Sequence, residues 1–143
     1  MRALSIKQPW ASGIARGAKT IEVRSWTTAH RGELLVCSSL APVQPAMANM
    51  IEDGVFAEFG ETWDRGAMIC VVNLVDVRPL RKSDRRGACF DIESVEGLYA
   101  WVLESPRAVV RSPIKGKLSL FNVDDGEVVF ASKRGKGRKA TKA

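Results

Sequence analysis

The sequence is poor in the residues that hold small metal-bound or disulfide-linked domains together. Its 143 residues include only three cysteines and one histidine. The cysteines are odd in number and include no CxxC pair; they are Cys37, Cys70 and Cys89. The sequence therefore predicts neither a disulfide framework nor a structural zinc site. We expect no metal and no cofactor. Cys37 and Cys70 lie within apolar runs and are expected to be buried thiols, whereas Cys89 stays unassigned.

Long apolar runs are also missing. The N-terminus reaches Lys7 before it could form the apolar centre of a signal peptide. No later stretch approaches the roughly 18 apolar residues of a membrane-spanning helix. We therefore expect a cytoplasmic protein with no membrane partner. A hydrophobic content of 45% over 143 residues suits one compact domain and leaves no room for a second.

Positive charge is in excess, and it is unevenly distributed. The net charge of +6 indicates an anionic partner. Six basic residues and no acidic one occupy the last eleven positions: Lys133, Arg134, Lys136, Arg138, Lys139 and Lys142. Removing these six from the 22 Lys and Arg leaves 16, equal to the 16 Asp and Glu. We therefore expect a formally neutral domain over 1–132 and a basic flexible tail over 133–143, which either contacts phosphates or only solubilises the chain.

Hydrophobic patterning predicts many short strands and two short helices. Strands are expected over 4–6, 19–24, 33–38, 67–77, 98–103, 109–110, 117–123 and 127–131. Helices are expected over 8–17 and 42–53, and loops over 56–66 and 81–87. Within 19–24, alternation places Ile21 and Val23 on one face and Thr20, Glu22 and Arg24 on the other. This pattern predicts an α+β fold, a mixed β-barrel with a few short flanking helices.

Chemically active side chains concentrate in one stretch of 22 residues. They are Trp10, Lys19, Glu22, Arg24, Ser25, Trp26, His30 and Arg31. If Trp26 continues the polar face of the strand, an acid, a guanidinium and an aromatic plane share one surface, which suits a base or nucleotide. The alternative is a solvated strand edge with a local ion pair. Trp63 and Trp101 are expected in the core.

The pattern Gly17-x-Lys19-x-x-Glu22-x-Arg24 resembles the GxKxxExR signature of the ASCH domain family. The resemblance extends over residues 4 to 123 and is closest to the version of the domain in a transcription coactivator. The other matching motifs are Ser5 to Ser12 (SIKQPWAS), Arg24-Ser25-Trp26, His30-Arg31-Gly32 and Pro113-Ile114-Lys115-Gly116. The resemblance implies a PUA-like barrel in which Lys19, Glu22 and Arg24 face a ligand in a cleft, with Trp10 and Trp26 nearby.

The first functional hypothesis is a nucleic-acid-binding domain for RNA or DNA. Its polar cleft would hold a base or nucleotide, and its tail would contact phosphates. Within the domain the candidate contacts are Trp10, Lys19, Glu22, Arg24, Ser25, Trp26, His30, Arg31 and Lys115. Within the tail they are Lys133, Arg134, Lys136, Arg138 and Lys139.

Two other functions stay open. ASCH-like relatives include hydrolases that act on RNA or on a modified cytidine, which would make Lys19 and Glu22 a catalytic pair. The sequence departs from the amidohydrolase branch because Glu22 stands where that branch carries threonine. The third hypothesis is a protein-interaction domain. The sequence determines neither the choice between RNA and DNA nor the oligomeric state.

Overall fold

The computed structural model describes residues 1–43 and 63–132. The helix expected over 42–53 falls almost entirely outside the described residues, as do most of the loop expected over 56–66 and the basic tail over 133–143. No helix within the described ranges is long and apolar enough to cross a membrane.

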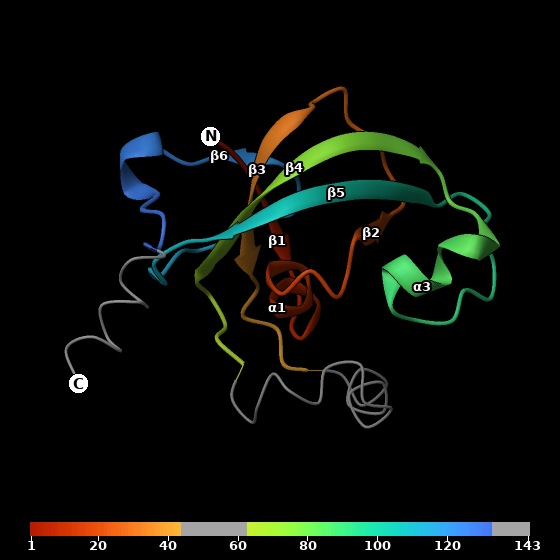
Figure 1. The fold of residues 1–143 in the computed structure, drawn as a ribbon, viewed down its shortest axis with the longest axis horizontal. Coiled ribbons are helices and arrows are strands. Elements are labelled where there is room, and N and C mark those ends of the chain that lie inside the picture. The colour runs from red at the N-terminus through yellow and green to blue at the C-terminus, as the bar shows by residue number, and fades with distance from the viewer. Residues whose placement is uncertain (44–62, 133–143) are drawn as a thin grey trace.

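Six strands of the described part of the chain form one mixed sheet. They are β1 (Arg2–Ile6), β2 (Ile21–Arg24), β3 (Gly32–Ser38), β4 (Met68–Pro79), β5 (Tyr99–Ala108) and β6 (Phe121–Asn122). Their order is β2-β5-β4-β3-β1-β6, with β1 and β3 parallel and the other neighbours antiparallel. The long strands β4 and β5 arch over β1 and the helix beside it, so the sheet curls into a half-barrel (Figure 1). The expected α+β mixed barrel with short flanking helices is confirmed.

The helix α1 (Trp10–Ala15) fills the concave side of the sheet. It is short because Gly17, with φ of +81°, turns the chain into the left-handed region that glycine tolerates. The buried side chain of Gln8 holds its first turn by accepting from the Ser12 amide and donating to the Ser12 hydroxyl. The inner core beneath α1 comprises Leu4, Ile6, Ala11, Ile14, Leu34, Val36, Ile69, Cys70, Val72, Leu74, Trp101 and Leu103.

The convex side of the sheet carries an outer core, closed by the chain after β5. It comprises Ala3, Leu35, Cys37, Met68, Val71, Val109, Phe121, Val123 and Val128. The strand expected over 117–123 shrinks to β6. The strand expected over 127–131 is replaced by a 3-10 turn, η3 (Asp125–Glu127), and a single bridge between Val109 and Phe130. Around this bridge the Val110 amide donates to the carbonyl oxygen of Val129 and the Ala131 amide donates to that of Ala108.

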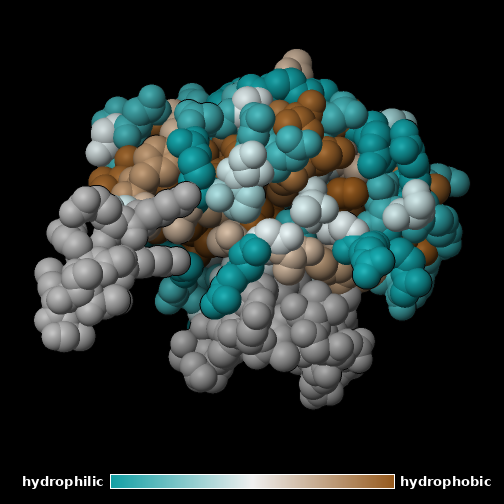
Figure 2. Space-filling model, viewed as in Figure 1, coloured by the Kyte–Doolittle hydropathy of each residue, from teal (hydrophilic) through white to brown (hydrophobic). Residues whose placement is uncertain are grey.

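The segment expected as a loop over 81–87 contains two short helical turns, η2 (Lys82–Asp84) and α3 (Arg85–Ala88). The cause is Asp84, whose buried carboxylate accepts from the Arg81 amide and from both terminal nitrogens of Arg78. These bonds fix the chain at the end of β4, and α3 then packs over β2 (Figure 1). In Figure 2, hydrophilic residues cover the α3 side of the molecule, and hydrophobic atoms show in the middle of the face.

Candidate functional site

The polar residues of β2 point into the half-barrel. Glu22 lies opposite Trp101 of β5, and directly opposed residues share a face of a sheet, so Glu22 points toward the inner core. Ile21 and Val23 belong to a separate apolar cluster with Ala88 at the end of α3. The predicted separation of Ile21 and Val23 from Glu22 is confirmed, and Glu22 is enclosed rather than solvated because it is only 8% exposed. Thr20, also expected on the polar face, lies before the strand and is exposed.

Lys19 is buried immediately before β2, with 2% of its surface exposed. Its Nζ donates to the carbonyl oxygen of Ala88 at 2.6 Å and lies 3.8 Å from Oε1 of Glu22. Strict alternation would place Lys19 on the opposite face from Glu22. The strand begins only at Ile21, so its alternation does not extend to Lys19. The Lys19 side chain therefore points toward Glu22.

Two aromatic rings flank the Lys19 ammonium. Nζ lies 4.9 Å from the ring centroid of Trp10 and 5.4 Å from that of Phe90. The two ring centroids are 6.0 Å apart with an interplanar angle of 54°. Sequence reasoning singled out Trp10 and missed Phe90. The available signal was a lone aromatic residue beside Cys89 within a charged stretch.

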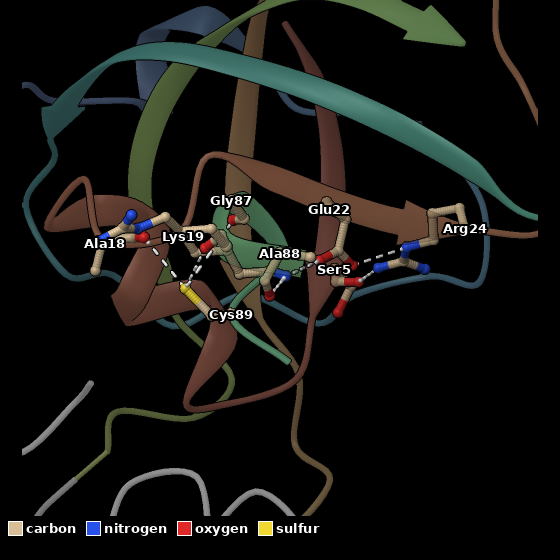
Figure 3. Close-up of polar contacts among 9 residues, drawn as sticks. Ser5, Ala18, Lys19, Glu22, Arg24, Gly87, Ala88 and Cys89 are labelled. Carbon is tan, nitrogen blue, oxygen red and sulfur yellow. Dashed lines mark hydrogen bonds and ion pairs between the residues drawn. The ribbon is translucent and has the colours of Figure 1, made fainter. Parts of the chain in front are cut away.

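Arg24 extends this arrangement across the half-barrel. Its Nε donates to Oε2 of Glu22 at 3.0 Å, and its Nη2 donates to the carbonyl oxygen of Ser5 in β1 at 2.9 Å. A chain of charged groups therefore runs from the end of α3 to β1 through Lys19, Glu22 and Arg24 (Figure 3). We call it the charged chain. The structure thus brings together the three charged residues of the four-residue signature.

Burial sets the protonation chemistry around the charged chain. It lowers the pKa of Lys19, and the nearby Glu22 carboxylate opposes this effect. Burial also raises the pKa of the Cys89 thiol, which donates to the carbonyl oxygen of Ala18 at 3.2 Å. Cys37 and Cys70 are fully buried as predicted, and burial raises the pKa of each to about 12. No cluster of metal-ligating side chains occurs within residues 1–43 and 63–132.

Trp26 does not present an open aromatic plane. Its ring packs edge-to-face against Trp101, with centroids 4.9 Å apart, and its carbonyl oxygen accepts from the Trp101 indole nitrogen. Trp101 is fully buried, as expected, whereas Trp63 is only partly buried. Ser25 is exposed. Trp26 therefore joins the wall of the half-barrel, and Trp10, which is also partly buried, packs against Phe90.

His30 and Arg31 lie apart from the charged chain. The His30 ring bonds to the carbonyl oxygen of Glu33, and Arg31 donates to the carbonyl oxygens of Thr28 and His30. They precede β3, whose start lies beside the start of β1 because those strands are parallel. Ser5 is three residues further along β1 from its start at Arg2, roughly 10 Å away at the usual rise of a strand. A shallow pocket near His30 is lined by Met1, Arg2, His30, Glu33, Asn122 and Asp125.

The turn containing Lys115 lies against β1. A Cβ on Gly116 would stand 2.5 Å from the Ser5 hydroxyl oxygen, so only glycine fits at this contact. Ser5 is also the residue whose carbonyl accepts from Arg24. The exposed residue Lys115 therefore belongs to a turn at the β1 end of the charged chain. The tail candidates Lys133, Arg134, Lys136, Arg138 and Lys139 lie outside the described residues.

Comparison with known proteins gives consistent matches. The sequence model of the ASCH domain family matches residues 4–112. Activating signal cointegrator 1 of Homo sapiens and of Mus musculus are each 29% identical over 128 residues, covering 85% of this chain and 22% of theirs. The chain thus spans about a fifth of the length of these relatives.

Solved structures show the same fold. The crystal structure of ASCH from Zymomonas mobilis superposes with a TM-score of 0.57 at 14% identity, covering 88% of this chain and 89% of that one. The crystal structure of a point mutant of the same protein superposes with a TM-score of 0.53 at 11% identity, covering 98% of this chain and 96% of that one. At this level of identity the likeness establishes the fold alone, in agreement with the PUA-like barrel that the motifs implied.

Proposed function

The chain belongs to the ASCH domain family, and we propose that it binds nucleic acid, holding a base or nucleotide in the cleft beside Arg24. The observation that carries this proposal is the state of the Arg24 guanidinium. Glu22 and Ser5 fix its orientation, yet 21% of the side chain is exposed and its Nη1 has no hydrogen bond within the described residues. An oriented guanidinium with a remaining donor suits a phosphate or a base edge.

The cost of the charged chain supports a functional role. Removing charged groups from water costs several kcal/mol per ion, and apolar side chains of similar volume are often as stabilising. Lys19 and Glu22 are nevertheless both less than one-tenth exposed. Their presence is better explained by what they orient than by a gain in stability.

The three charged residues have different roles in this proposal. Arg24 contacts the ligand. Lys19 and Glu22 are positioning residues: the Lys19 ammonium is buried against Ala88, and Glu22 uses one carboxylate oxygen for each of its basic neighbours. The partly buried Trp10 ring supplies an aromatic surface at the Lys19 end, and its stacking on a base would be tolerant of sequence.

A hydrolase is the second candidate, and the lowered pKa of Lys19 favours it. Burial makes the Lys19 ammonium easier to deprotonate, and a neutral lysine is able to accept a proton from a hydroxyl or a water molecule. Nucleic-acid binding without turnover is the stronger reading, because Nζ is already bonded to Ala88 and almost inaccessible.

The division of the chain is also part of the proposal. We infer that residues 133–143 add salt-dependent affinity to a domain over 1–132 that has no formal net charge. On single strands each lost phosphate contact lowers the slope of log affinity against log salt by about 0.7. Deletion of 133–143 is expected to reduce that slope, and an unchanged slope contradicts the role of the tail. A cytoplasmic location stays a prediction.

The main test compares binding and turnover in one set of variants. Fluorescence anisotropy with single-stranded RNA, single-stranded DNA and duplex DNA measures Kd for the natural chain, Arg24→Lys, Trp10→Ala and the control Arg2→Lys at the far end of β1. We expect tenfold or larger losses for Arg24→Lys and Trp10→Ala, and no loss for the control. Equal affinity of all four proteins contradicts the proposal that nucleic acid binds beside Arg24 and Trp10.

Turnover is followed by chromatography of an RNA oligonucleotide and a modified cytidine, with and without divalent cations. Substrate loss that disappears in Lys19→Met and Glu22→Gln establishes the hydrolase. Binding with intact substrate supports the binding domain. Absence of binding to every nucleic acid at moderate salt contradicts the proposed function and favours a protein-interaction domain.

A further inference from the structure

The segment 113–120 is a loop held firmly at both ends. Pro113 bridges to Ala67, and the Ile114 amide donates to the carbonyl oxygen of Gly66. At the other end Leu120 packs against the inner core and leads into β6. Between these anchors Gly116 lies against the Ser5 side chain.

The loop passes around the open edge of β1. Leu4 and Ile6 face the inner core and Ala3 faces the outer core, so the intervening Ser5 side chain faces outward, and Gly116 meets it there. Leu120 is already on the inner side. Residues 117–119 therefore cross the edge where the Ser5 carbonyl accepts from Arg24.

The middle of the loop carries two exposed cations and a protruding apolar side chain. Leu118 is 98% exposed. Lys115 and Lys117 are exposed and form no hydrogen bond or ion pair within residues 1–43 and 63–132. Residues 108–123 include no acidic residue, and Arg111, the remaining cation there, is paired with Asp64. A single exposed aliphatic side chain is common on a protein surface, but Leu118 lies on an anchored loop next to two lysines that have no partner among the described residues.

We propose that Lys115, Lys117 and Leu118 form a second contact for single-stranded nucleic acid, next to the cleft. The inference rests on the proposed function and extends it: a strand whose base lies beside Arg24 continues over this loop. The lysines contact successive phosphates, and Leu118 packs against the face of an unpaired base. Phosphate is the complementary charge, and apolar side chains inserted against bases are a general device of nucleic-acid binding.

The experiment separates the loop from the cleft by ligand length. Anisotropy and competition measure Kd for a single-stranded 12-mer and for a nucleoside monophosphate. The variants are Lys115→Ala with Lys117→Ala, and Leu118→Ser. Arg2→Ala and Val75→Ser are matched controls that remove an exposed cation and an exposed aliphatic group elsewhere.

For the 12-mer we expect the double lysine variant to lower the salt slope by about 1.4, and Leu118→Ser to weaken binding about tenfold. The monophosphate, which fills only the cleft, keeps its affinity in both variants. The controls retain the natural slope and Kd. Thermal unfolding confirms that each variant folds.

Three outcomes overturn the inference. If the loop variants bind the 12-mer like the natural chain while Arg24→Lys loses affinity, the loop contact is wrong and the cleft stands. If the loop variants lose monophosphate affinity equally, the loop supports the cleft and makes no contact of its own. If the natural chain binds neither ligand, both the inference and the proposed function fail.

Discussion

The guanidinium of Arg24, at the end of β2, donates a 2.9 Å hydrogen bond to the carbonyl oxygen of Ser5 in β1. β2 and β1 are not neighbours in the sheet, and β6 covers β1 only at Arg2 and Ala3. A side chain, not a backbone ladder, therefore connects the two sides of the half-barrel at this point. A side-chain connection is able to give way to a ligand without disrupting the sheet.

Replacement of Arg24 by methionine tests how much this connection contributes to stability. Arg24→Met leaves the buried Glu22 carboxylate with Lys19 as its one remaining ionic partner within residues 1–43 and 63–132. The free energy of unfolding is expected to fall by about 2–3 kcal/mol, since a lost charge-assisted hydrogen bond strands a buried acceptor. Urea titration followed by tryptophan fluorescence measures it. Arg2→Met is the control, and equal stability of both variants would refute the structural part of the argument.

The lowered pKa of Lys19 predicts a specific pH dependence of stability. Between that lowered pKa and the ordinary value of 10.5, the unfolded chain binds a proton that the folded chain has released. Stability contributed by this site therefore rises with pH across that window. The difference in unfolding free energy between the natural chain and Lys19→Met, measured from pH 6 to pH 10, should increase with pH. A constant difference means that Lys19 titrates in the folded protein as it does in water.

Two aspartates give a matched pair for the region around α3. Asp84 is buried and bound by both terminal nitrogens of Arg78, whereas Asp91 forms an exposed ion pair with Arg85. Asp84→Asn is expected to cost about 2 kcal/mol because it weakens the charge-assisted hydrogen bonds from the partly buried Arg78 guanidinium to a buried acceptor. Asp91→Asn should cost under about 1 kcal/mol. Chemical denaturation compares them, and similar costs would contradict the assignment of Asp84 as the residue that fixes this turn.

Asp84 also predicts a loss of stability in acid. The Arg78 guanidinium holds the pKa of this carboxyl below its ordinary value of 3.8. The stability that the ionised Asp84 carboxylate contributes is fully present above pH 3.8, the pKa of the unfolded chain. This stability is lost as the pH falls through the lower pKa of Asp84 in the folded chain. The natural chain should therefore lose more stability than Asp84→Asn between pH 5 and pH 2, by circular dichroism melting. Parallel curves would disprove the linkage.

Gly116→Ala tests the close contact between the 113–120 loop and β1. The added methyl would stand 2.5 Å from the Ser5 hydroxyl oxygen and 2.7 Å from its Cβ. Displacing the loop is expected to cost about 1–3 kcal/mol. The second substitution Ser5→Gly should recover most of this loss by removing both atoms. Gly126→Ala, whose methyl would be 3.5 Å from its nearest neighbour, should cost little. If Ser5→Gly does not restore the stability lost in Gly116→Ala, the contact with Ser5 is not the cause of that loss.

The sequence by itself determined the fold class, and its resemblance to the ASCH signature named the three members of the charged chain. Alternation along 19–24 put Ile21 and Val23 on the side opposite Glu22, and the apolar runs around Cys37 and Cys70 predicted their burial. These are local periodicities and compositions, which carry over into structure because each depends on neighbours close in sequence.

Only the tertiary structure decided where the polar face of β2 points and which candidates meet. Glu22 is enclosed because β5 and α1 curve over it, and Lys19 reaches it because α3 supplies the Ala88 carbonyl from a distant part of the chain. The same parallel pairing of β1 with β3 separates His30 from Ser5, although His30 lies close to Arg24 in sequence. Proximity along the chain does not fix proximity across a sheet, because strand order and register are set by long-range pairing.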